Sequence, residues 1–167
     1  MEIMLKFTEV TQENIPALAQ LAHEIWFEYW KTLLSPEQIE YMVEKFQSEK
    51  AIQNQYANEH YTYWFINLNG ENIGYFGLSE RPQYLFLSKL YIKKDFRSQG
   101  FGHKAFDEIK KIAAEKHYNE IQLTVNKYNS NTIAAYKKWR LEIIDAVVTD
   151  IGSGFVMDDY IMSYKCV

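Results

Sequence analysis

The spacing of hydrophobic positions changes along the chain, and each spacing predicts one kind of element. Apolar residues recur three and four positions apart over residues 14–30 and 36–46, which predicts two helices. The segment 49–59 is more polar and fits a third helix. Ahead of these helices, residues 3–10 roughly alternate between apolar and polar and predict a short strand. The first third of the chain is therefore expected to be one strand followed by helices.

The rest of the chain alternates between helical patterns and runs of aromatic and β-branched residues, which are typical of strands. We predict strands over 60–68, 73–79, 84–93, 121–125, 141–150 and 155–165, and helices over 101–117 and 129–139. The run at 84–93 is almost continuously apolar, so we expect this strand to lie in the middle of the sheet.

This order of elements predicts an α+β fold. The strand–helix–strand segment 84–125 requires one parallel, right-handed crossover, whereas the short turns at 69–72 and 151–154 predict antiparallel hairpins. We therefore expect a three-layer α/β/α sandwich around a mixed, mostly antiparallel sheet of roughly seven strands. Residues 1–167 would form a single domain, because this length suits one core.

Two local signals mark where helices begin. Pro16 is tolerated only in a first helical turn, which places the start of its helix near Thr11 or Asn14. The segment 35–38, Ser-Pro-Glu-Gln, matches a capping box, in which the serine and the residue three positions later satisfy each other's main-chain donors. The second helix is therefore expected to begin at Pro36.

Composition limits the class of protein. Hydrophobic residues make up 47% and charged residues 24%, which is ordinary for a soluble globular domain. The single cysteine, Cys166, cannot form an internal disulfide, and no apolar run approaches the ~18 residues of a membrane span. We expect no signal peptide, no metal site and no membrane partner. A cytoplasmic protein is the resulting prediction.

Charge is distributed unevenly along the chain. The net charge of −4 argues against nucleic acid as a partner. Residues 1–60 hold 4 Lys/Arg against 10 Asp/Glu, a net charge of −6, and residues 93–111 hold 6 against 3, a net charge of +3. The basic segment suits a polyanionic cofactor, and the acidic one suits a cationic co-substrate such as an amine. The alternative for the acidic segment is that Glu-rich helices only solvate their outer faces.

The segment 97–102, Arg-Ser-Gln-Gly-Phe-Gly, lies between a predicted strand and a predicted helix. Glycines let the main chain turn tightly, and the next helix points unpaired N–H groups at the turn, so this order builds an anion cradle. The Lys-Ser or Lys-Thr of a P-loop is missing, and so is the third glycine of a dinucleotide fingerprint. A structural turn without a ligand is the alternative.

The surroundings of this turn narrow the ligand. The pattern Arg-x-x-Gly-x-Gly at 97–102, after the strand end Leu-Tyr-Ile-Lys at 90–93, resembles the acetyl-CoA-binding motif of the GNAT superfamily of N-acetyltransferases. The segment 129–138, Asn-Ser-Asn-Thr-Ile-Ala-Ala-Tyr-Lys-Lys, is similar to the family's other cofactor segment, Asn-x-x-Ala-Ile-x-x-Tyr-x-Lys. Together with the order of elements, the resemblance covers about residues 60–165.

The chain departs from the family pattern in two places. Thr132 stands where alanine is usual, and Trp139-Arg140-Leu141 replaces a sequence x-Gly-Phe. The second change removes the glycine that would end the helix in a left-handed conformation. The sequence therefore leaves the end of this helix open.

The resemblance implies which residues bind coenzyme A. Main-chain N–H groups over 99–103 would bind the pyrophosphate, and strand residues 90–92 would pair with the pantetheine arm. Arg97 would approach a phosphate or brace the loop. Asn129 and Asn131 would bond the pantetheine or cap the helix. The implied set is Leu90, Tyr91, Ile92, Arg97, Ser98, Gln99, Gly100, Phe101, Gly102, His103, Asn129, Asn131 and Tyr136.

The same resemblance implies direct acetyl transfer from acetyl-CoA to an amine. The amine must lose a proton, since an alkyl ammonium has a pKa of about 10.4 and no lone pair. A main-chain N–H of Tyr91 or Ile92 would polarise the thioester oxygen, and Tyr136 would donate a proton to the departing thiolate. The alternative for Tyr136 is a buried side chain that only packs beneath its helix.

The general base is the least determined residue. Glu24 and Glu28 lie four apart on one face of the first helix, where family members often build the acceptor site. Trp26, Tyr29 and Trp30 nearby can wall a pocket for a cation. We predict Glu24 and Glu28 as catalytic candidates. The alternative is an amphipathic helix with solvated acids and buried aromatics.

Asp158 and Asp159 in the last strands are a second acidic candidate, with one carboxylate facing the sheet and the other facing solvent. A bound water or a backbone relay is expected to serve in place of one indispensable base.

Three functions fit these observations. The leading one is an N-acetyltransferase for a small cationic amine such as a polyamine, which the acidic residues 1–60 and the aromatic helix favour. A peptidyl acceptor, either a protein N-terminus or a lysine, is the second. The third is a non-catalytic acyl-CoA-binding regulatory domain, against which Tyr136 argues. A homodimer is also expected, because an aromatic-rich surface usually has a partner.

Overall fold

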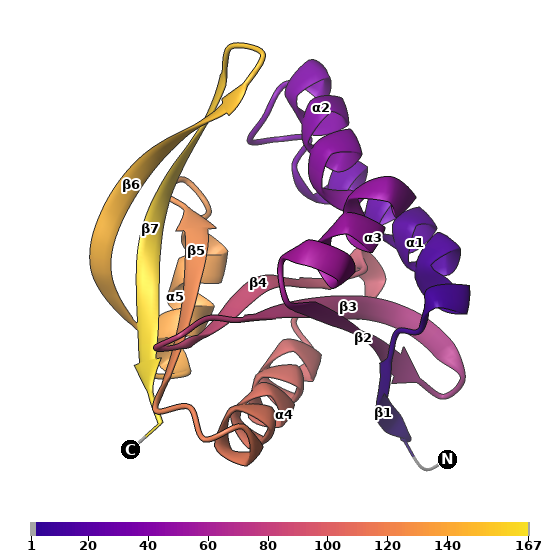
Figure 1. The fold of residues 1–167 in the computed structure, drawn as a ribbon, viewed down its shortest axis with the longest axis vertical. Helices are drawn as coiled ribbons and strands as arrows, with labels where there is room; N and C mark the ends of the chain where they lie inside the picture. The colour runs from indigo at the N-terminus through magenta and orange to yellow at the C-terminus, as the bar shows by residue number, and fades with distance from the viewer. Residues whose placement is uncertain (1–2, 167) are drawn as a thin grey trace.

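The computed structural model describes residues 3–166, which build a seven-stranded sheet in the order β1-β2-β3-β4-β5-β7-β6 (Figure 1). The strands are β1 (Leu5–Glu9), β2 (Tyr61–Leu68), β3 (Glu71–Glu80), β4 (Leu85–Ile92), β5 (Glu120–Asn126), β6 (Glu142–Gly152) and β7 (Phe155–Lys165). All neighbouring pairs are antiparallel except β4 with β5, which form the predicted parallel crossover.

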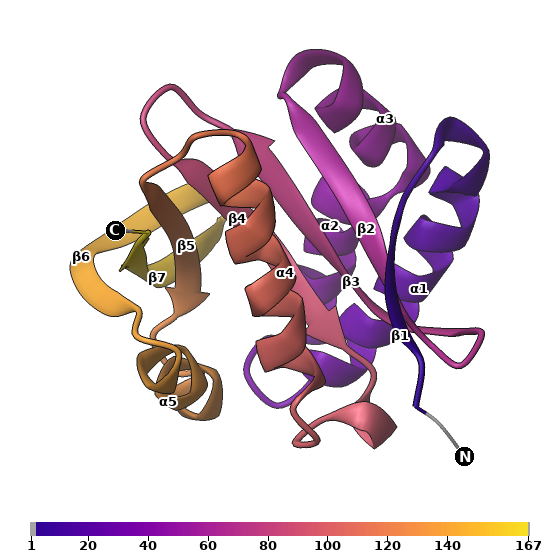
Figure 2. The ribbon, with the colours of Figure 1, turned by 90° about the horizontal axis from the view of Figure 1, so that it is seen from below.

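Helices cover both faces of the sheet, which confirms the predicted three-layer sandwich. The helices are α1 (Ile15–Tyr29), α2 (Pro36–Gln47), α3 (Glu49–Asn58), α4 (Phe101–Glu115) and α5 (Ser130–Lys138). In Figure 2, α4 lies in front of the sheet and α1, α2 and α3 lie behind it. Within residues 3–166, no helix combines the length and the apolar character needed to cross a membrane.

Each face of the sheet has its own core. On one face, Phe106 and Ile109 of α4 pack with Phe76 of β3. On the other face, Leu18 of α1 and Met42 of α2 belong to the cluster beneath the three N-terminal helices. The apolar stripe of each helix therefore explains which side of the sheet it covers.

The helix starts follow the local signals, with one exception. Helix α1 begins at Ile15 with Asn14 as its N-cap, so Pro16 lies in the first turn as expected. The Ser35 side chain accepts a hydrogen bond from the Gln38 main-chain N–H at 3.1 Å. The Gln38 amide does not return the bond but donates to the Val156 carbonyl at 3.0 Å. Only half of the predicted capping box forms, because the Gln38 side chain is directed to β7 by this bond and does not accept from the Ser35 N–H.

Helix α5 ends without the family glycine. Arg140 itself adopts the left-handed conformation, with φ of 72°. The Arg140 N–H then donates to the Lys137 carbonyl, and the Leu141 N–H donates to the Tyr136 carbonyl, both at 3.0 Å. These are the two bonds of a Schellman motif. The left-handed conformation of a non-glycine residue is unfavourable by roughly 1–2 kcal/mol, so the motif at Arg140 is less stable than one with glycine by about that amount.

The sheet splits between β4 and β5. The two strands pair only over residues 85–87, whereas β4 remains paired with β3 as far as Ile92 opposite Gly74. Beyond this point the strands diverge (Figure 1). The second half of β4 therefore has no β5 residue beside it, and its main chain is free on that side to pair with another extended group.

Candidate active site

A cleft of about 1090 Å³ lies where the free half of β4, the start of α4 and α5 meet. It is lined by Leu90, Tyr91, Ile92, Arg97, Ser98, Gly100, Phe101, Gly102, His103, Asn129, Asn131 and Tyr136. Of the residues predicted for the cofactor, only Gln99 is missing from this lining. Its side-chain amide donates to the Asp95 carbonyl at 3.0 Å.

The predicted anion cradle has the required main-chain conformation. Ser98 and Gly100 both adopt left-handed angles, with φ of 62° and 86°, and they reverse the chain before α4. The first backbone hydrogen bond of α4 runs from the Lys104 N–H to the Gly100 carbonyl. Among residues 3–166, no carbonyl accepts from the N–H groups of 101–103, so these donors and the positive end of the helix are available to an anion.

The Gly102 position adds a second constraint on this turn. A Cβ atom there would lie 3.3 Å from the Trp139 ring, which is closer than usual packing allows. The ring of Trp139 stacks in turn on His103, with centroids 5.5 Å apart. Trp139 therefore packs directly against the main chain of the cradle at Gly102. The free N–H donors of the cradle suit the pyrophosphate that the sequence predicts.

Arg97 braces the loop, which is the second of its two predicted roles. Its Nε donates to the Ile92 carbonyl at 2.7 Å, and its Nη2 forms an ion pair with Glu28 at 2.8 Å. The guanidinium also lies 4.9 Å from the centroid of the Tyr29 ring. One side chain thus joins the end of β4, the cradle and α1.

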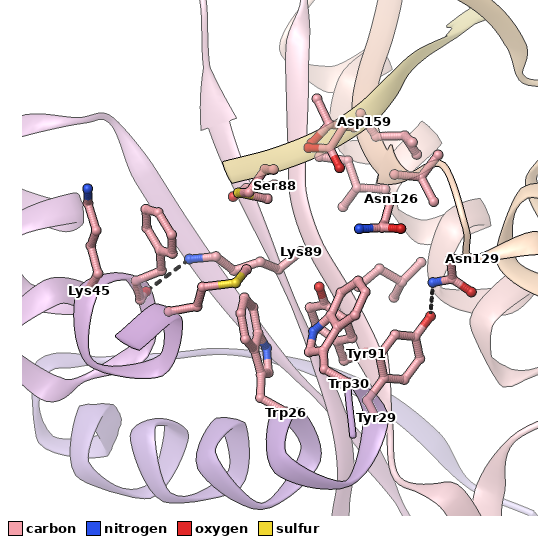
Figure 3. A pocket seen from close by; sticks show the side chains of 18 of the residues that line it. Trp26, Tyr29, Trp30, Lys45, Ser88, Lys89, Tyr91, Asn126, Asn129 and Asp159 are labelled. Atoms are coloured by element: carbon pink, nitrogen blue, oxygen red, sulfur yellow. Dashed lines mark hydrogen bonds between the residues drawn. The ribbon is translucent and has the colours of Figure 1, made fainter. Parts of the chain in front are cut away.

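A second cavity of about 480 Å³ lies between α1, α2 and α3 on one side and β4, β5 and β7 on the other (Figure 3). Its walls include Trp26, Tyr29 and Trp30, as predicted for an acceptor pocket. The residues that line both cavities are Tyr29, Leu90, Tyr91, Asn129, Thr132 and Tyr136. The two cavities therefore meet beside the free half of β4.

Glu24 and Glu28, the predicted catalytic carboxylates, do not lie where the two cavities meet. Neither residue lines either cavity. Glu24 is exposed on α1, and Glu28 is held in the ion pair with Arg97. These two carboxylates therefore match the alternative of an amphipathic helix with its acids on the outside.

Tyr136 lies at the junction of the two cavities. It is only 8% exposed, and among residues 3–166 its hydroxyl has no hydrogen-bond partner. Burial raises the pKa of Tyr136, so the hydroxyl keeps its proton at neutral pH. The side chain can therefore act as a hydrogen-bond or proton donor at this point.

A hydrogen-bonded group joins α1 to α5 across the junction. The Asn129 amide donates to the Tyr29 hydroxyl at 2.5 Å, and that hydroxyl is 2.7 Å from the Thr132 hydroxyl. The threonine in place of the usual alanine thus has a structural role. Asn129 is the N-cap of α5 but makes no side-chain capping bond, so the simple capping explanation for it is wrong. Asn131 is exposed at the edge of the cleft.

Asp159 is a buried acid in the second cavity. It is 4% exposed, whereas its neighbour Asp158 is half-buried and pairs with Lys127 at 2.9 Å. Burial, and secondarily the charge of Asp158, raise the pKa of Asp159 to about 6, while Lys127 opposes the shift. Among the described lining residues, Asp159 and Glu59 are the only carboxylates. The alternation predicted that one of the two aspartates faces inward without saying which, and the structure identifies it as Asp159.

Lys89 is the polar residue of this cavity that the sequence-based prediction missed. It lies in β4, is 7% exposed, and donates to the Phe46 carbonyl at 3.1 Å. Burial lowers the pKa of Lys89 to about 7. The available signal was a lone lysine inside an almost continuously apolar strand.

In the described residues there is no cluster of three or more His, Cys, Asp or Glu that would hold a metal ion.

Comparison with known proteins agrees with this geometry. A family model described as the Acetyltransferase (GNAT) family matches residues 15–140. An uncharacterized N-acetyltransferase in the pepI 3′ region of Lactobacillus delbrueckii subsp. lactis is 22% identical over 135 residues, which cover 76% of this chain and 78% of that protein.

A shorter match and a solved structure complete the comparison. Thialysine N-epsilon-acetyltransferase of Bos taurus is 28% identical over 69 residues, 41% of each chain. The structure of PaiA N-acetyltransferase from Thermoplasma acidophilum in complex with coenzyme A superimposes with a TM-score of 0.76. The two chains are 22% identical, and the match covers 99% of each.

Proposed function

The chain belongs to the acetyltransferase (GNAT) family, and we propose that it moves the acetyl group of acetyl-CoA directly to the primary amine of a small molecule. Membership makes it an N-acetyltransferase with acetyl-CoA as co-substrate. The observation that carries the proposal is the second cavity, which meets the cofactor cleft at Tyr136 and Tyr91. Its volume of about 480 Å³ is within the range of small-molecule sites.

The chain's own groups suit the binding of coenzyme A. The free N–H groups at the start of α4 would hold the pyrophosphate, and the unpaired main chain at the end of β4 would bond the amides of the pantetheine arm. When bound, acetyl-CoA supplies an activated thioester. The main-chain N–H of Tyr91 or Ile92 would polarise its carbonyl oxygen.

We assign the handling of the amine proton to Asp159 in place of Glu24 and Glu28. An ammonium with a pKa of about 10.4 is roughly 6.5 units above an ordinary aspartate. At a pKa of about 6, Asp159 narrows this gap by about two units, which favours proton transfer by on the order of 100-fold. Asp159 would accept the proton, directly or through water, as the nitrogen lone pair becomes available.

Tyr136 would serve the leaving group. Its hydroxyl has no partner among the described residues, so it is free to donate to the developing thiolate. A hydroxyl that keeps its proton at neutral pH is suited to this role. The presence of both Tyr136 and Asp159 argues against a regulatory domain that only binds acyl-CoA.

We propose a small molecule, and not a peptide, as the acceptor. The cavity lies beneath three helices and the sheet, and a peptide would have to enter among them. The name of the Bos taurus relative places its acetyl group on the ε-nitrogen of thialysine, a primary amine. Of the acidic residues that the structure describes in 3–60, only Glu59 lines the cavity, so the acidic half gives little support to a polycationic acceptor.

Exposed apolar side chains offer a place for the expected second copy. They lie on β6 and at the start of β7, and they are Ile143, Ile144, Val148 and Val156. Pairing of two copies along this outer strand would cover them. The homodimer stays a prediction.

An acceptor screen tests the proposed function. Release of coenzyme A is measured with a thiol reagent for a panel of small amines, amino acids and short peptides, and acetyl-CoA binding is measured separately by calorimetry. We expect turnover with at least one class of small primary amine. Tight acetyl-CoA binding with no turnover across the whole panel would support the regulatory domain, and turnover confined to peptides would support the second acceptor class.

A further inference from the structure

Lys89 reaches the second cavity because of a one-residue irregularity in β4. Gly77 of β3 lies opposite Lys89, but the next residue, Leu78, lies opposite Leu87, so Ser88 is left without a partner. Such a bulge reverses the faces of the residues that follow. Leu87 packs in the core beneath α4, whereas Lys89 contacts α2 on the opposite side of the sheet. Without the bulge, the lysine would lie in an apolar core.

Neutral groups hold the Lys89 amine in place. Its Nζ donates to the Tyr63 hydroxyl at 2.5 Å and to the Phe46 carbonyl at 3.1 Å. Gln55 supports both partners, accepting from the Tyr63 hydroxyl at 2.5 Å and donating to the Phe46 carbonyl at 2.9 Å. An ammonium has three donors, so this network fixes the amine and leaves one N–H available.

No carboxylate completes the environment of this lysine. Among residues 3–166, no acidic side chain lies within 4.0 Å of Lys89, and Glu59 acts on it only through its more distant charge. A buried cation without a counter-ion is unfavourable unless something else offsets the loss of water. Because Lys89 lines the cavity, the missing anion can come from a bound molecule.

The charges of the cavity are separated along its length. In Figure 3, Lys45 and Lys89 lie on one side, and Asp159 lies on the other side with Asn126. Asp159 lies opposite Asn126, the last residue of β5, from which the chain leads to Asn129, a residue that lines both cavities. The Lys89 amine instead contacts α2, on the side away from Asn129 in Figure 3. The acidic side is therefore the one nearer the cofactor cleft.

We propose that the acceptor is a primary amine that also carries a carboxylate, with the carboxylate bound by Lys89 and the amine directed to Asp159. This inference rests on the proposed function and adds the class of acceptor to it. A diamine of the same length would instead place a second ammonium against Lys89, where the two positive charges repel. Because burial lowers the pKa of Lys89, a bound carboxylate would also hold the lysine in its charged form.

Pairs of amines that differ only by a carboxylate test this assignment. The pairs are lysine with cadaverine, ornithine with putrescine, and 5-aminopentanoate with butylamine, and the measurement is kcat/KM from coenzyme A release. We expect the carboxylate-bearing member to be preferred at least tenfold in one or more pairs. Equal or better turnover of the amines without a carboxylate in all three pairs would overturn the inference while leaving the proposed function intact.

A substitution then connects the preference to the residue. Lys89→Met keeps an unbranched side chain as far as Cε and removes the charged Nζ, so we expect the preference within each pair to fall towards unity, mainly through a higher KM for the carboxylate-bearing amine. Lys6→Met, at an exposed lysine of β1, should keep the wild-type preference. A preference that survives Lys89→Met would overturn the assignment of the carboxylate to Lys89.

Two further measurements keep the outcomes separate. Circular dichroism and thermal unfolding check that Lys89→Met is folded, and if it is not, the comparison of amine pairs on the wild-type protein decides alone. If acetyl-CoA binds but no amine with or without a carboxylate is acetylated, the proposed function fails and this inference fails with it.

Discussion

Replacing Asp159 by asparagine is expected to remove most of the acetyl transfer and to stabilise the folded protein. The substitution keeps the shape of the side chain and removes one buried charge. Asp159 is 4% exposed, and none of the described residues forms an ion pair with it. The same desolvation that makes the carboxylate a better base therefore also makes it a cost to folding.

The size of the stability effect follows from the pKa. The pKa of Asp159 rises from 3.8 to about 6 on folding, a change of about two units, and each unit corresponds to about 1.4 kcal/mol. Since the folded-state pKa is the higher one, this group's contribution to stability is fully present below pH 4 and is lost as the pH rises through 6. At pH 8 the ionised side chain thus lowers the free energy of unfolding by about 3 kcal/mol.

Asp159→Asn restores this free energy of unfolding at pH 8, reduced by the free energy needed to bury the amide of the asparagine. Urea unfolding at pH 5 and pH 8, followed by tryptophan fluorescence, measures the difference between the variant and the wild type. The variant should gain up to about 3 kcal/mol at pH 8 and roughly half of that at pH 5, where the folded aspartate is still mostly protonated but the unfolded one is already ionised.

The activity should change in the opposite direction. A general base contributes roughly 10²–10⁴-fold, so kcat/KM of Asp159→Asn should fall by that amount. The wild-type rate should rise with pH through about 6 as Asp159 ionises, and this acid limb should disappear in the variant. Coenzyme A release between pH 5 and 9 measures both effects.

The neighbouring aspartate provides a matched control. Asp158→Asn removes a charge that raises the pKa of Asp159 and frees Lys127, which lowers it, so the acid limb should move to lower pH but persist. The reasoning is refuted if Asp159→Asn keeps the acid limb, or if its activity stays within a few-fold of the wild type.

Three other substitutions, one of them with a matched control, separate the roles proposed for the site. Glu28→Gln removes the ion-pair partner of Arg97 and should weaken acetyl-CoA binding about fivefold, which corresponds to about 1 kcal/mol. The acid limb of kcat should remain, and loss of that limb would identify Glu28 as the base. Tyr136→Phe should lower kcat at least tenfold with little change in the KM for acetyl-CoA, and equal rates would exclude it as the donor. Gly100→Val and Gly70→Val replace glycines with φ of 86° and 92°, and no atom lies within 4 Å of the added Cβ at either, so both should lose a similar stability of roughly 1–2 kcal/mol. Calorimetry should show loss of acetyl-CoA binding only for Gly100→Val.

Local patterns explain how much of the fold could be predicted. Every predicted strand and helix is present, and its ends lie within two residues of the prediction, because the period of the apolar positions and the turn residues act over a few neighbours. The cradle at 97–102 is equally local, since it needs only a strand end, glycine and a helix start. The end of α5 was left open because Arg140 had to adopt a conformation that its residue type disfavours.

Contacts between distant segments set the limit of prediction for the site. The sequence could offer two roles for Arg97 but could not choose between them, because the choice depends on Glu28, 69 positions away. Lys89 was missed for a related reason. Its access to the cavity depends on one unpaired residue, Ser88, and a shift of one residue turns every following side chain to the other face of a strand.

Charge shows the same limit in its clearest form. The net charge of −6 over residues 1–60 suggested a cationic acceptor, but a sum over a segment says nothing about which side of a helix carries the charges. In the folded chain most of the acids described over residues 3–60 face outward, and among them Glu59 alone reaches the cavity. A few buried charges act more strongly than many solvated ones, because water no longer screens them. The charge that the acceptor carries should therefore follow from Lys89 and Asp159, at opposite sides of one cavity, and not from the acidic surface around it.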